Sequence, residues 1–329
     1  MSNLTQTTSD TVQEIRISGL RRTLRAVGIK GEDPNLTSVV SPRSIDALRI
    51  IVGLVMLYDA WASLGLSHKT EMAQFLGVGM DSGWVALVVA AVSFMKLAIS
   101  ASLLSGRGVQ AMGWVGVIYG LLVWIAMEHG GDFGQDATDP GLGLPYVITF
   151  LYLVGADRLR REGDASGNEI LSLARVAFAL LWAYDAVLKF QPYFINHYLE
   201  YLMDAQKDVG AQSWQGLYDQ AWIAVSSAIG AKFVAVLVGA IEAAVAIGLL
   251  SGRGLRLLGP IGIALSLVIW TTAEEWGGPY SLGVAAQMSM RLIGIAVIYV
   301  IAFGYVWILY NPLDLIRGRH ATAADAAHR

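Results

Sequence analysis

Two short runs of the sequence place an acid beside a tyrosine within an apolar stretch. One is Tyr58-Asp59-Ala60 and the other is Tyr184-Asp185-Ala186. A charged side chain inside a membrane-spanning helix is costly, so such residues point to a functional site or to a specific pairing. Carboxylates can accept protons, and a phenol can hydrogen-bond a quinone oxygen or an oxyanion. The two runs are therefore candidate sites of ligand binding or proton exchange.

Further charged residues accompany the second run. Lys189 follows Asp185 by one helical turn, so the two side chains can share a helix face. Glu274 ends a later apolar stretch, and Arg291 lies near the start of the last one. Lysine and arginine offer the donors that an oxyanion needs, whereas the acids can take up protons. The predicted catalytic residues are Asp185, Glu274 and Tyr184. The predicted substrate-binding residues are Lys189, Arg291, Asp59, Tyr58 and Glu128.

Two interpretations of these charges stay open. In one, they line a polar pocket near the outer membrane surface. In the other, Asp59 and Asp185 pair with Arg291 and Lys189 and only hold helices together.

A separate pair, Lys96 and Glu242, occupies equivalent positions of an internal repeat with opposite charges. We expect these two residues to form a structural salt bridge between the repeats rather than a proton path.

The histidines and cysteines limit the cofactors. The chain has no cysteine, and none of its five histidines lies in the middle of an apolar segment. We therefore expect no haem and no iron–sulfur cluster. His68, His129 and His197 fall in outer loops and could converge on copper or zinc. Scattered loop histidines are more often solvated, so we expect no metal site.

The composition indicates where these residues act. Of the 329 residues, 55% are hydrophobic and 15% are charged. Water-soluble domains carry about 25% charged residues, so this chain is predicted to lie in a lipid bilayer. The net charge is −3, which excludes a basic nucleic-acid-binding protein. Eight segments are predicted to cross the hydrocarbon core, which takes about 20 residues each. They are 45–66, 83–104, 109–128, 142–157, 170–190, 221–250, 255–274 and 285–310.

Arginine is concentrated in alternate connections between these segments. Arginines follow the second, fourth, sixth and eighth segments, whereas the opposite loops hold only Lys69 and Lys207 as clear cations. The positive-inside rule therefore predicts a multi-pass protein of the cell membrane with both termini in the cytoplasm. Asp59 then lies about 14 residues, or roughly 21 Å, from the cytoplasmic end of its helix. This depth places the candidate acids in the outer half of the membrane.

The sequence contains an internal repeat. Leu-Ser-Gly-Arg-Gly at 104–108 recurs 146 residues later at 250–254, whereas the two Tyr-Asp-Ala runs are 126 residues apart. About 20 residues are therefore inserted near 191–221, where aromatic residues predict a short interfacial helix. This helix is either an anchor at the membrane surface or a lid over a site between the repeats. Four spans in each copy give both copies the same orientation. The predicted fold is all-α, with two tandem four-helix bundles related by a pseudo-twofold axis along the membrane normal.

The repeat and the charge pattern also divide the chain into parts. Residues 1–44 are predicted to be a basic amphipathic cytoplasmic segment. The first four-helix unit covers 45–162, and the second covers 163–312 with the insertion at its outer side. Residues 313–329 are predicted to form a cytoplasmic tail.

The second half also resembles a known family. It begins with Arg175, continues to Asp185-Ala-Val-Leu-Lys189-Phe190, and reads Glu274-Glu-Trp-Gly-Gly after its third span. This pattern resembles the DoxX/DoxD-like membrane proteins, which are built of four-helix units. Residues 45–160 match it more weakly, since Ser63 stands where Lys189 stands.

The resemblance implies a function for the chain. One branch of the family is the membrane subunit of thiosulfate:quinone oxidoreductase. The resemblance thus implies an integral membrane subunit of a quinone-linked oxidoreductase of the respiratory chain. Its implied substrate is thiosulfate or a related sulfur oxyanion, with a protein partner subunit. The alternatives are a non-catalytic membrane subunit of a larger respiratory or oxygenase complex, or a small-solute or proton-coupled transporter.

Overall fold

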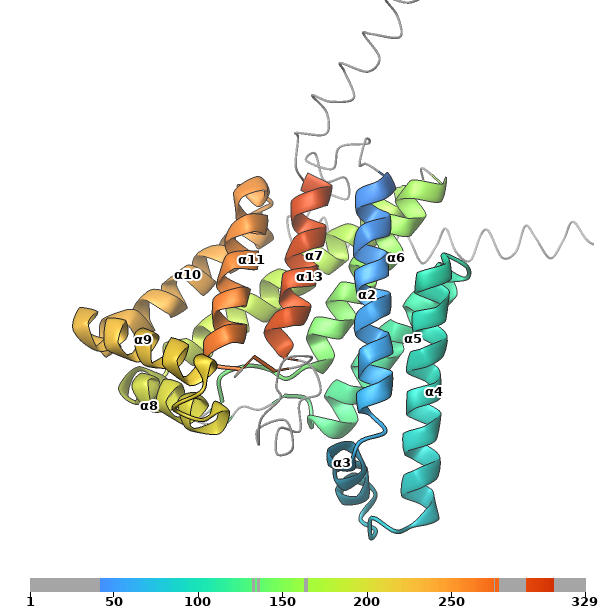
Figure 1. Ribbon diagram of the computed structural model, residues 1–329. Coiled ribbons are helices and arrows are strands. Elements are labelled where there is room, and N and C mark those ends of the chain that lie inside the picture. The colour runs from blue at the N-terminus through green and yellow to red at the C-terminus, as the bar shows by residue number, and fades with distance from the viewer. Residues whose placement is uncertain are drawn as a thin grey trace, which may run out of the picture.

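The structure is a computed structural model that describes residues 42–131, 134, 137–162, 165–274, 276–277 and 294–310. Within these ranges every regular element is a helix (Figure 1). The first group is α2 (Pro42–Ala62), α3 (Leu66–Leu76), α4 (Gly83–Ser105), α5 (Val109–Leu122), the π-helical turn η1 (Val123–Met127) and α6 (Gly143–Glu162). The second group is α7 (Ala165–Lys189), α8 (Pro192–Val209), α9 (Trp214–Ile229), α10 (Ala231–Ser251), α11 (Leu255–Thr272) and α13 (Ile295–Tyr310).

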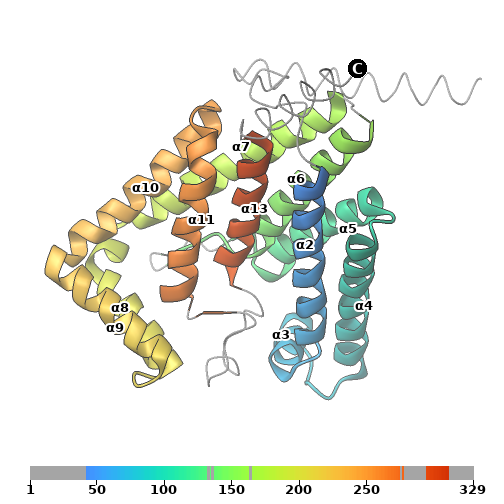
Figure 2. The same cartoon turned by 45° about the horizontal axis from the view of Figure 1, so that its top comes forward.

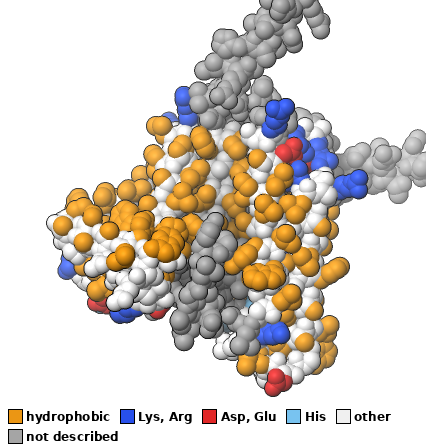
Figure 3. Space-filling view, viewed as in Figure 1, with side chains coloured by type: hydrophobic (Ala, Val, Ile, Leu, Met, Phe, Trp, Pro, Cys, Tyr) orange, Lys and Arg blue, Asp and Glu red, His pale blue; other side chains and the backbone are white. Residues whose placement is uncertain are grey.

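Five of these helical segments are long and apolar enough to cross a membrane. They are Gly83–Ser105, Val109–Met127, Ser166–Lys189, Ala231–Ser251 and Leu255–Thr272. Large apolar side chains on them point outward, including Phe94, which is 74% exposed, and Ile247, which is 67% exposed. Figure 3 shows such side chains spread over the helices of one face. A lipid environment accounts for this exposure, so the predicted all-helical membrane protein is confirmed.

Helices α2, α4, α11 and α13 run roughly side by side, whereas α7 and α10 slant across the bundle (Figures 1 and 2). In Figures 1 and 2, α2 begins and α13 ends at the same end of the bundle, while α3, α8 and α9 lie at the opposite end. Glycine turns close the carboxyl ends of α4 and α10, where Gly106 and Gly252 adopt left-handed φ angles of 72° and 66°. Arg49 donates to the carbonyl oxygen of Leu103, and Arg175 donates to that of Leu249. Each arginine thus hydrogen-bonds a backbone carbonyl near the carboxyl end of a helix, α4 in one half of the chain and α10 in the other.

Several element boundaries differ from the sequence-based prediction. The first segment ends at Ala62 rather than near residue 66, and a separate helix, α3, follows it. The segment predicted at 221–250 is divided at Gly230, whose φ of 109° favours glycine and ends α9. The region near 191–221 therefore forms two helices, α8 and α9, instead of one short helix. Positions 285–293 of the eighth segment, the chain before α2 and the predicted tail lie outside the described residues.

Helices in the two halves pack in matching pairs. Helix α2 packs along α4 as α7 packs along α10, and α5 packs along α6 as α11 packs along α13. Glycines permit the latter two contacts. A Cβ on Gly116 would meet the ring of Phe150, and a Cβ on Gly262 would meet the ring of Phe303. Small residues allow such close approach between membrane helices.

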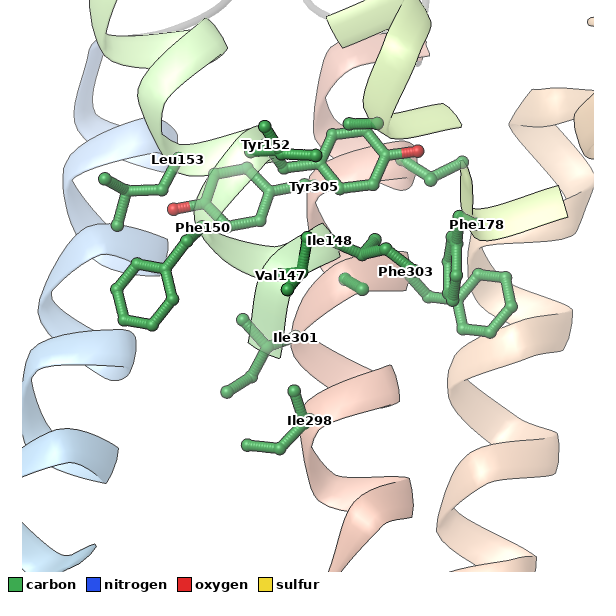
Figure 4. Close-up of a cluster of buried hydrophobic side chains, with 14 of the residues drawn as sticks. Val147, Ile148, Phe150, Tyr152, Leu153, Phe178, Ile298, Ile301, Phe303 and Tyr305 are labelled. Carbon is green, nitrogen blue, oxygen red and sulfur yellow. The ribbon is translucent and has the colours of Figure 1, made fainter. Parts of the chain in front are cut away.

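The core lies where α6, α7 and α13 meet. Figure 4 shows aromatic and branched side chains from these helices in one cluster, including Phe178 and Phe303. The rings of Tyr152 and Tyr305 stack with centroids 6.0 Å apart and an interplanar angle of 5°. Helix α6 also packs against α7, and α13 against α2. The two halves are therefore held together by their fourth and first long helices.

Candidate functional site

The first cluster consists of Asp59, Ser63, Lys96 and Tyr146. Lys96 Nζ lies 2.9 Å from Asp59 Oδ2 and donates to Ser63 Oγ at 2.7 Å. The Tyr146 hydroxyl donates to Asp59 Oδ2 at 3.3 Å. Both charged side chains are buried, with exposed fractions of 2% for Lys96 and 4% for Asp59. The first cluster is a closed ion pair whose groups bond to one another.

This arrangement corrects the prediction that Lys96 pairs with Glu242. Helix α2 packs against α4, so Lys96 of α4 pairs with Asp59 of the adjacent helix α2. Glu242 lies on α10, which packs along α7 and faces Asp185. Each residue of the proposed pair therefore belongs to a different cluster.

The second cluster consists of Asp185, Lys189, Glu242 and Tyr299. The Tyr299 hydroxyl donates to Asp185 Oδ2 at 3.1 Å, as Tyr146 does to Asp59. Glu242 repels the negative charge of Asp185, and Lys189 offsets part of that repulsion. Asp139, in the connection before α6, adds a further negative charge near Asp185. Among the described residues the second cluster therefore brings three carboxyl groups near a single lysine.

Lys189 does not close the second cluster as Lys96 closes the first. Its Nζ donates to the carbonyl oxygen of Thr138 and lies 5.0 Å from the ring centre of Phe194. Asp185 Oδ1 and Glu242 Oε2 are buried and have no hydrogen-bond partner among the described residues. A buried acceptor without a donor costs free energy, so these two oxygens are the strongest indication of a ligand position.

The two clusters differ by an exchange of residue types at matched positions. Glu242 stands 146 residues after Lys96, and Lys189 stands 126 residues after Ser63. The cation of the first cluster comes from the neighbouring helix, whereas that of the second comes from the helix that carries the aspartate. This exchange leaves two carboxylates facing each other in the second cluster.

Glu128 and Glu274, predicted as pocket residues, bind helix amino termini. Glu128 accepts from the backbone N–H of Leu142 at 2.7 Å and of Gly143 at 3.0 Å, where α6 begins. Glu274 accepts from the N–H of Ala296 at 3.0 and 3.1 Å, where α13 begins. Carboxylates stabilise such ends because the N–H groups there lack helical partners. Both acids thus position the helices that carry the site tyrosines.

The hydroxyl groups that bond the two aspartates do not come from Tyr58 and Tyr184, which the sequence predicts as ligand-contacting residues. Those hydroxyls belong to Tyr146 and Tyr299, while the ring of Tyr58 packs against Trp61. The sequence pattern did not single them out, because Tyr146 lies near the start of the segment predicted at 142–157, whereas Tyr299 lies in the middle of that predicted at 285–310. Tyr184 is only partly buried beside Asp185. Arg291 lies outside the described residues.

A helical hairpin of α8 and α9 adjoins the second cluster. Phe194 of α8 lies against Lys189, and Tyr218 of α9 bonds Thr271 at the end of α11 at 2.9 Å. Trp214 and Trp276 pack with ring centroids 4.8 Å apart. The hairpin is therefore attached both to the end of α7, which carries Lys189, and to the end of α11.

One acid of this hairpin is isolated from water. Asp219 is fully buried, and neither carboxylate oxygen has a hydrogen-bond partner among the described residues. Burial raises the pKa of Asp219 to about 7 because the charged form loses its hydration.

The three outer histidines lie on different elements. His68 is buried in α3, His129 is exposed after η1, and His197 stacks on Tyr193 with ring centroids 4.1 Å apart. Within the described ranges, no three histidine or acidic side chains form a group that could hold a metal ion.

Comparisons of the chain with protein-family profiles, with curated proteins and with solved structures find no match.

Proposed function

We propose that the chain is an integral membrane subunit of a quinone-linked oxidoreductase and that the second cluster is its quinone-headgroup site. The observation that carries this proposal is the pair of buried acceptors, Asp185 Oδ1 and Glu242 Oε2, without partners among the described residues. Reduction of a quinone to a hydroquinone takes two electrons and two protons. Two carboxylates at the headgroup supply proton carriers at the place where protons are needed.

The proposal includes two tandem units of four spans each. Its support is the same helix order in both halves, the matching contacts of Gly116 with Phe150 and Gly262 with Phe303, and the stacking of Tyr152 on Tyr305. Residues at corresponding positions meet at a twofold axis, which accounts for the stacked tyrosines.

The orientation of the bundle is part of the proposal. We propose that the end at which α2 begins is cytoplasmic, because the arginine-rich connections lie at that end.

The charges of the second cluster favour a neutral headgroup over an oxyanion. One lysine stands among the carboxylates of Asp185, Glu242 and Asp139. A sulfur oxyanion such as thiosulfate, which the resemblance to DoxX/DoxD-like proteins suggests as electron donor, needs cationic partners outside this group. Arg291 is the sequence-based candidate for that role. Electrons would then pass from the oxyanion, or from a partner subunit, to the quinone.

The two clusters provide a matched test. The Asp185→Asn protein should retain its melting temperature and lose the quinone that co-purifies with the wild type, because Asp185 contacts the headgroup. The Asp59→Asn protein should retain its quinone and melt at a lower temperature, because Lys96 then lacks its buried partner. Quinone content after solvent extraction and thermal unfolding of each purified protein measure both effects. Equal quinone content in the wild type and Asp185→Asn would contradict the proposal.

A further inference from the structure

We infer that helix α9 lies in the surface of the lipid bilayer, with one apolar face in the hydrocarbon, and so anchors the hairpin of α8 and α9 without crossing the membrane. The membrane surface concerned is the one at the end of the bundle where α8 and α9 lie (Figure 1). The sequence leaves an anchor and a lid open for this region, and the exposed side chains of α9 favour the anchor. The inference does not depend on the proposed quinone site.

The exposed apolar residues of α9 form one stripe along the helix. They recur at spacings of three and four residues, which places them on a single helix face. Leu217 is 57% exposed and Val225 is 49% exposed. The opposite face of α9 is buried. A contiguous apolar surface of this kind marks contact with a membrane or with another protein. The members of the stripe are Trp214, Leu217, Ala221, Val225 and Ala228.

The stripe continues onto the exposed surface of α10, which identifies lipid as its partner. Helix α9 ends at Gly230, and α10 follows directly as a segment that is long and apolar enough to cross a membrane. Ile229, just before the junction, is 57% exposed, and Phe233, just after it, is 62% exposed. Hydrocarbon covers the exposed face of a spanning helix, so the adjoining stripe of α9 meets the same hydrocarbon.

The charged residues of the hairpin lie on α8 instead. They are exposed and also recur at spacings of three and four residues, and Lys207 Nζ lies 2.6 Å from Asp204 Oδ1. Figure 3 shows charged side chains along the lower edge of the hairpin and apolar side chains above them. Because α8 and α9 pack against each other, the hairpin as a unit presents a charged side to water and an apolar side to lipid. The charged residues are Glu200, Asp204, Lys207 and Asp208.

The part of the stripe next to α10 lies away from the place where residues 278–293, outside the described ranges, join the structure. Trp276 packs against Trp214, the first residue of α9. A Cβ on Gly277 would lie 3.6 Å from Gly294 Cα, so that segment leaves and returns at one place. Val225 lies roughly 16 Å farther along α9 than Trp214, on the side of the junction with α10.

The experiment uses the absence of cysteine from the chain, since one introduced cysteine then carries a nitroxide label at a single position. Leu217→Cys and Val225→Cys probe the stripe. Phe94→Cys marks the lipid-facing surface of α4, and Asp204→Cys marks the charged side of α8. The labelled full-length proteins are placed in phosphatidylcholine bilayers. Power-saturation electron paramagnetic resonance then compares collisions of each label with oxygen, which concentrates in hydrocarbon, and with a water-soluble nickel chelate.

The labels at 217 and 225 should resemble the label at 94, with oxygen collisions exceeding nickel collisions, whereas the label at 204 should show the reverse. Nickel collisions at 217 and 225 that match those at 204 would place the stripe in water and overturn the inference. Labels at 217 and 225 shielded from both reagents would overturn it as well. Spin–spin broadening that disappears on dilution with unlabelled protein would then identify a second copy of the chain as the partner.

A pair of charge substitutions gives an independent measurement. Val225→Glu introduces a carboxylate where we expect hydrocarbon, so it should lower the melting temperature in lipid nanodiscs. Met203→Glu makes a similar apolar-to-acid change at an exposed position of α8 and should leave the melting temperature nearly unchanged. Equal melting temperatures of the two variants would contradict the placement of α9 in lipid.

Discussion

Lys96 Nζ and Asp59 Oδ2 lie 2.9 Å apart in a pair that is almost completely buried. The corresponding positions of the second half hold Glu242 and Asp185, which repel each other. In the first half of the chain, a lysine therefore forms an ion pair with the buried acid. In the second half, each of the two buried acids has one oxygen without a hydrogen-bond partner among the described residues. The closed cluster explains stability, and the open cluster is where a ligand is expected.

Loss of the Lys96 ammonium should destabilise the protein strongly. Lys96→Ala leaves the Asp59 carboxylate buried without its counter-charge, and cutting such a pair costs about 3–5 kcal/mol. The control is Lys207→Ala, which removes a solvent-exposed pair with Asp204 and should change stability little. Unfolding in detergent, followed by circular dichroism, compares the two. A similar loss in both variants would disprove the buried-pair account.

Replacing the closely packed glycines by alanine should destabilise the protein to a similar degree in both halves. Gly116→Ala and Gly262→Ala each drive a methyl group into a phenylalanine ring, and overpacking of this kind costs about 1–3 kcal/mol. Gly83→Ala is the control, because a Cβ there meets no atom within 4 Å. Melting temperatures of the three proteins measure the effect. If only one of the two buried glycines proved sensitive, the halves would not be packed alike.

Asp219 should make stability depend on pH. Its pKa is raised to about 7 by burial, whereas a carboxyl in an unfolded chain titrates at about 3.9. Between these values the folded protein holds a proton that the unfolded chain has lost. Stability should therefore be full below pH about 4, fall as the pH rises to about 7, and level off above it.

The matched variant isolates that contribution. Asp219→Asn cannot ionise, so the decline between pH about 4 and 7 should shrink by about 1.4 kcal/mol for each unit of pKa shift removed. Thermal unfolding across this pH range, with tryptophan fluorescence to report the hairpin, provides the measurement. An unchanged pH profile in the variant would show that another group is responsible.

The orientation of the bundle is open to a direct check. Arginine-rich connections lie at the end where α2 begins, so both termini should be cytoplasmic. A reporter fused after Arg319 that works only in the cytoplasm should be active, and one placed between α8 and α9 should be inactive. The reverse pattern would invert the proposed topology and place the second cluster on the cytoplasmic side.

The sequence predicts the class of fold better than it predicts the contacts of the site. Apolar segments of membrane length predict α4 and α11 closely, because their length and composition alone determine a span. Helix periodicity does not say which helix is the neighbour, so Lys96 was assigned to Glu242 instead of Asp59. The sequence pattern also did not predict that Gly230 separates α9 from α10, since apolar residues continue on both sides of it.

The roles of the acids illustrate the same limit. Asp185 and Glu274 look alike in sequence, as acids near the outer end of an apolar segment. Glu274 reaches the free N–H groups at the start of α13, whereas Asp185 Oδ1 remains buried without a partner among the described residues. Only the three-dimensional neighbours separate the helix cap from the candidate ligand group. Tyr299 was likewise missed because its partner is 114 residues away in the chain.

The most direct test of the central claim is to locate the bound quinone. A photoreactive azidoquinone, incubated with the purified protein and activated by light, should label peptides of α7 and α10 around Asp185 and Glu242. Excess unlabelled quinone should prevent this labelling, and the folded Asp185→Asn protein should lack it. Labelling confined to the first cluster around Asp59, or spread over lipid-exposed helices and insensitive to competition, would contradict a quinone site in the second cluster.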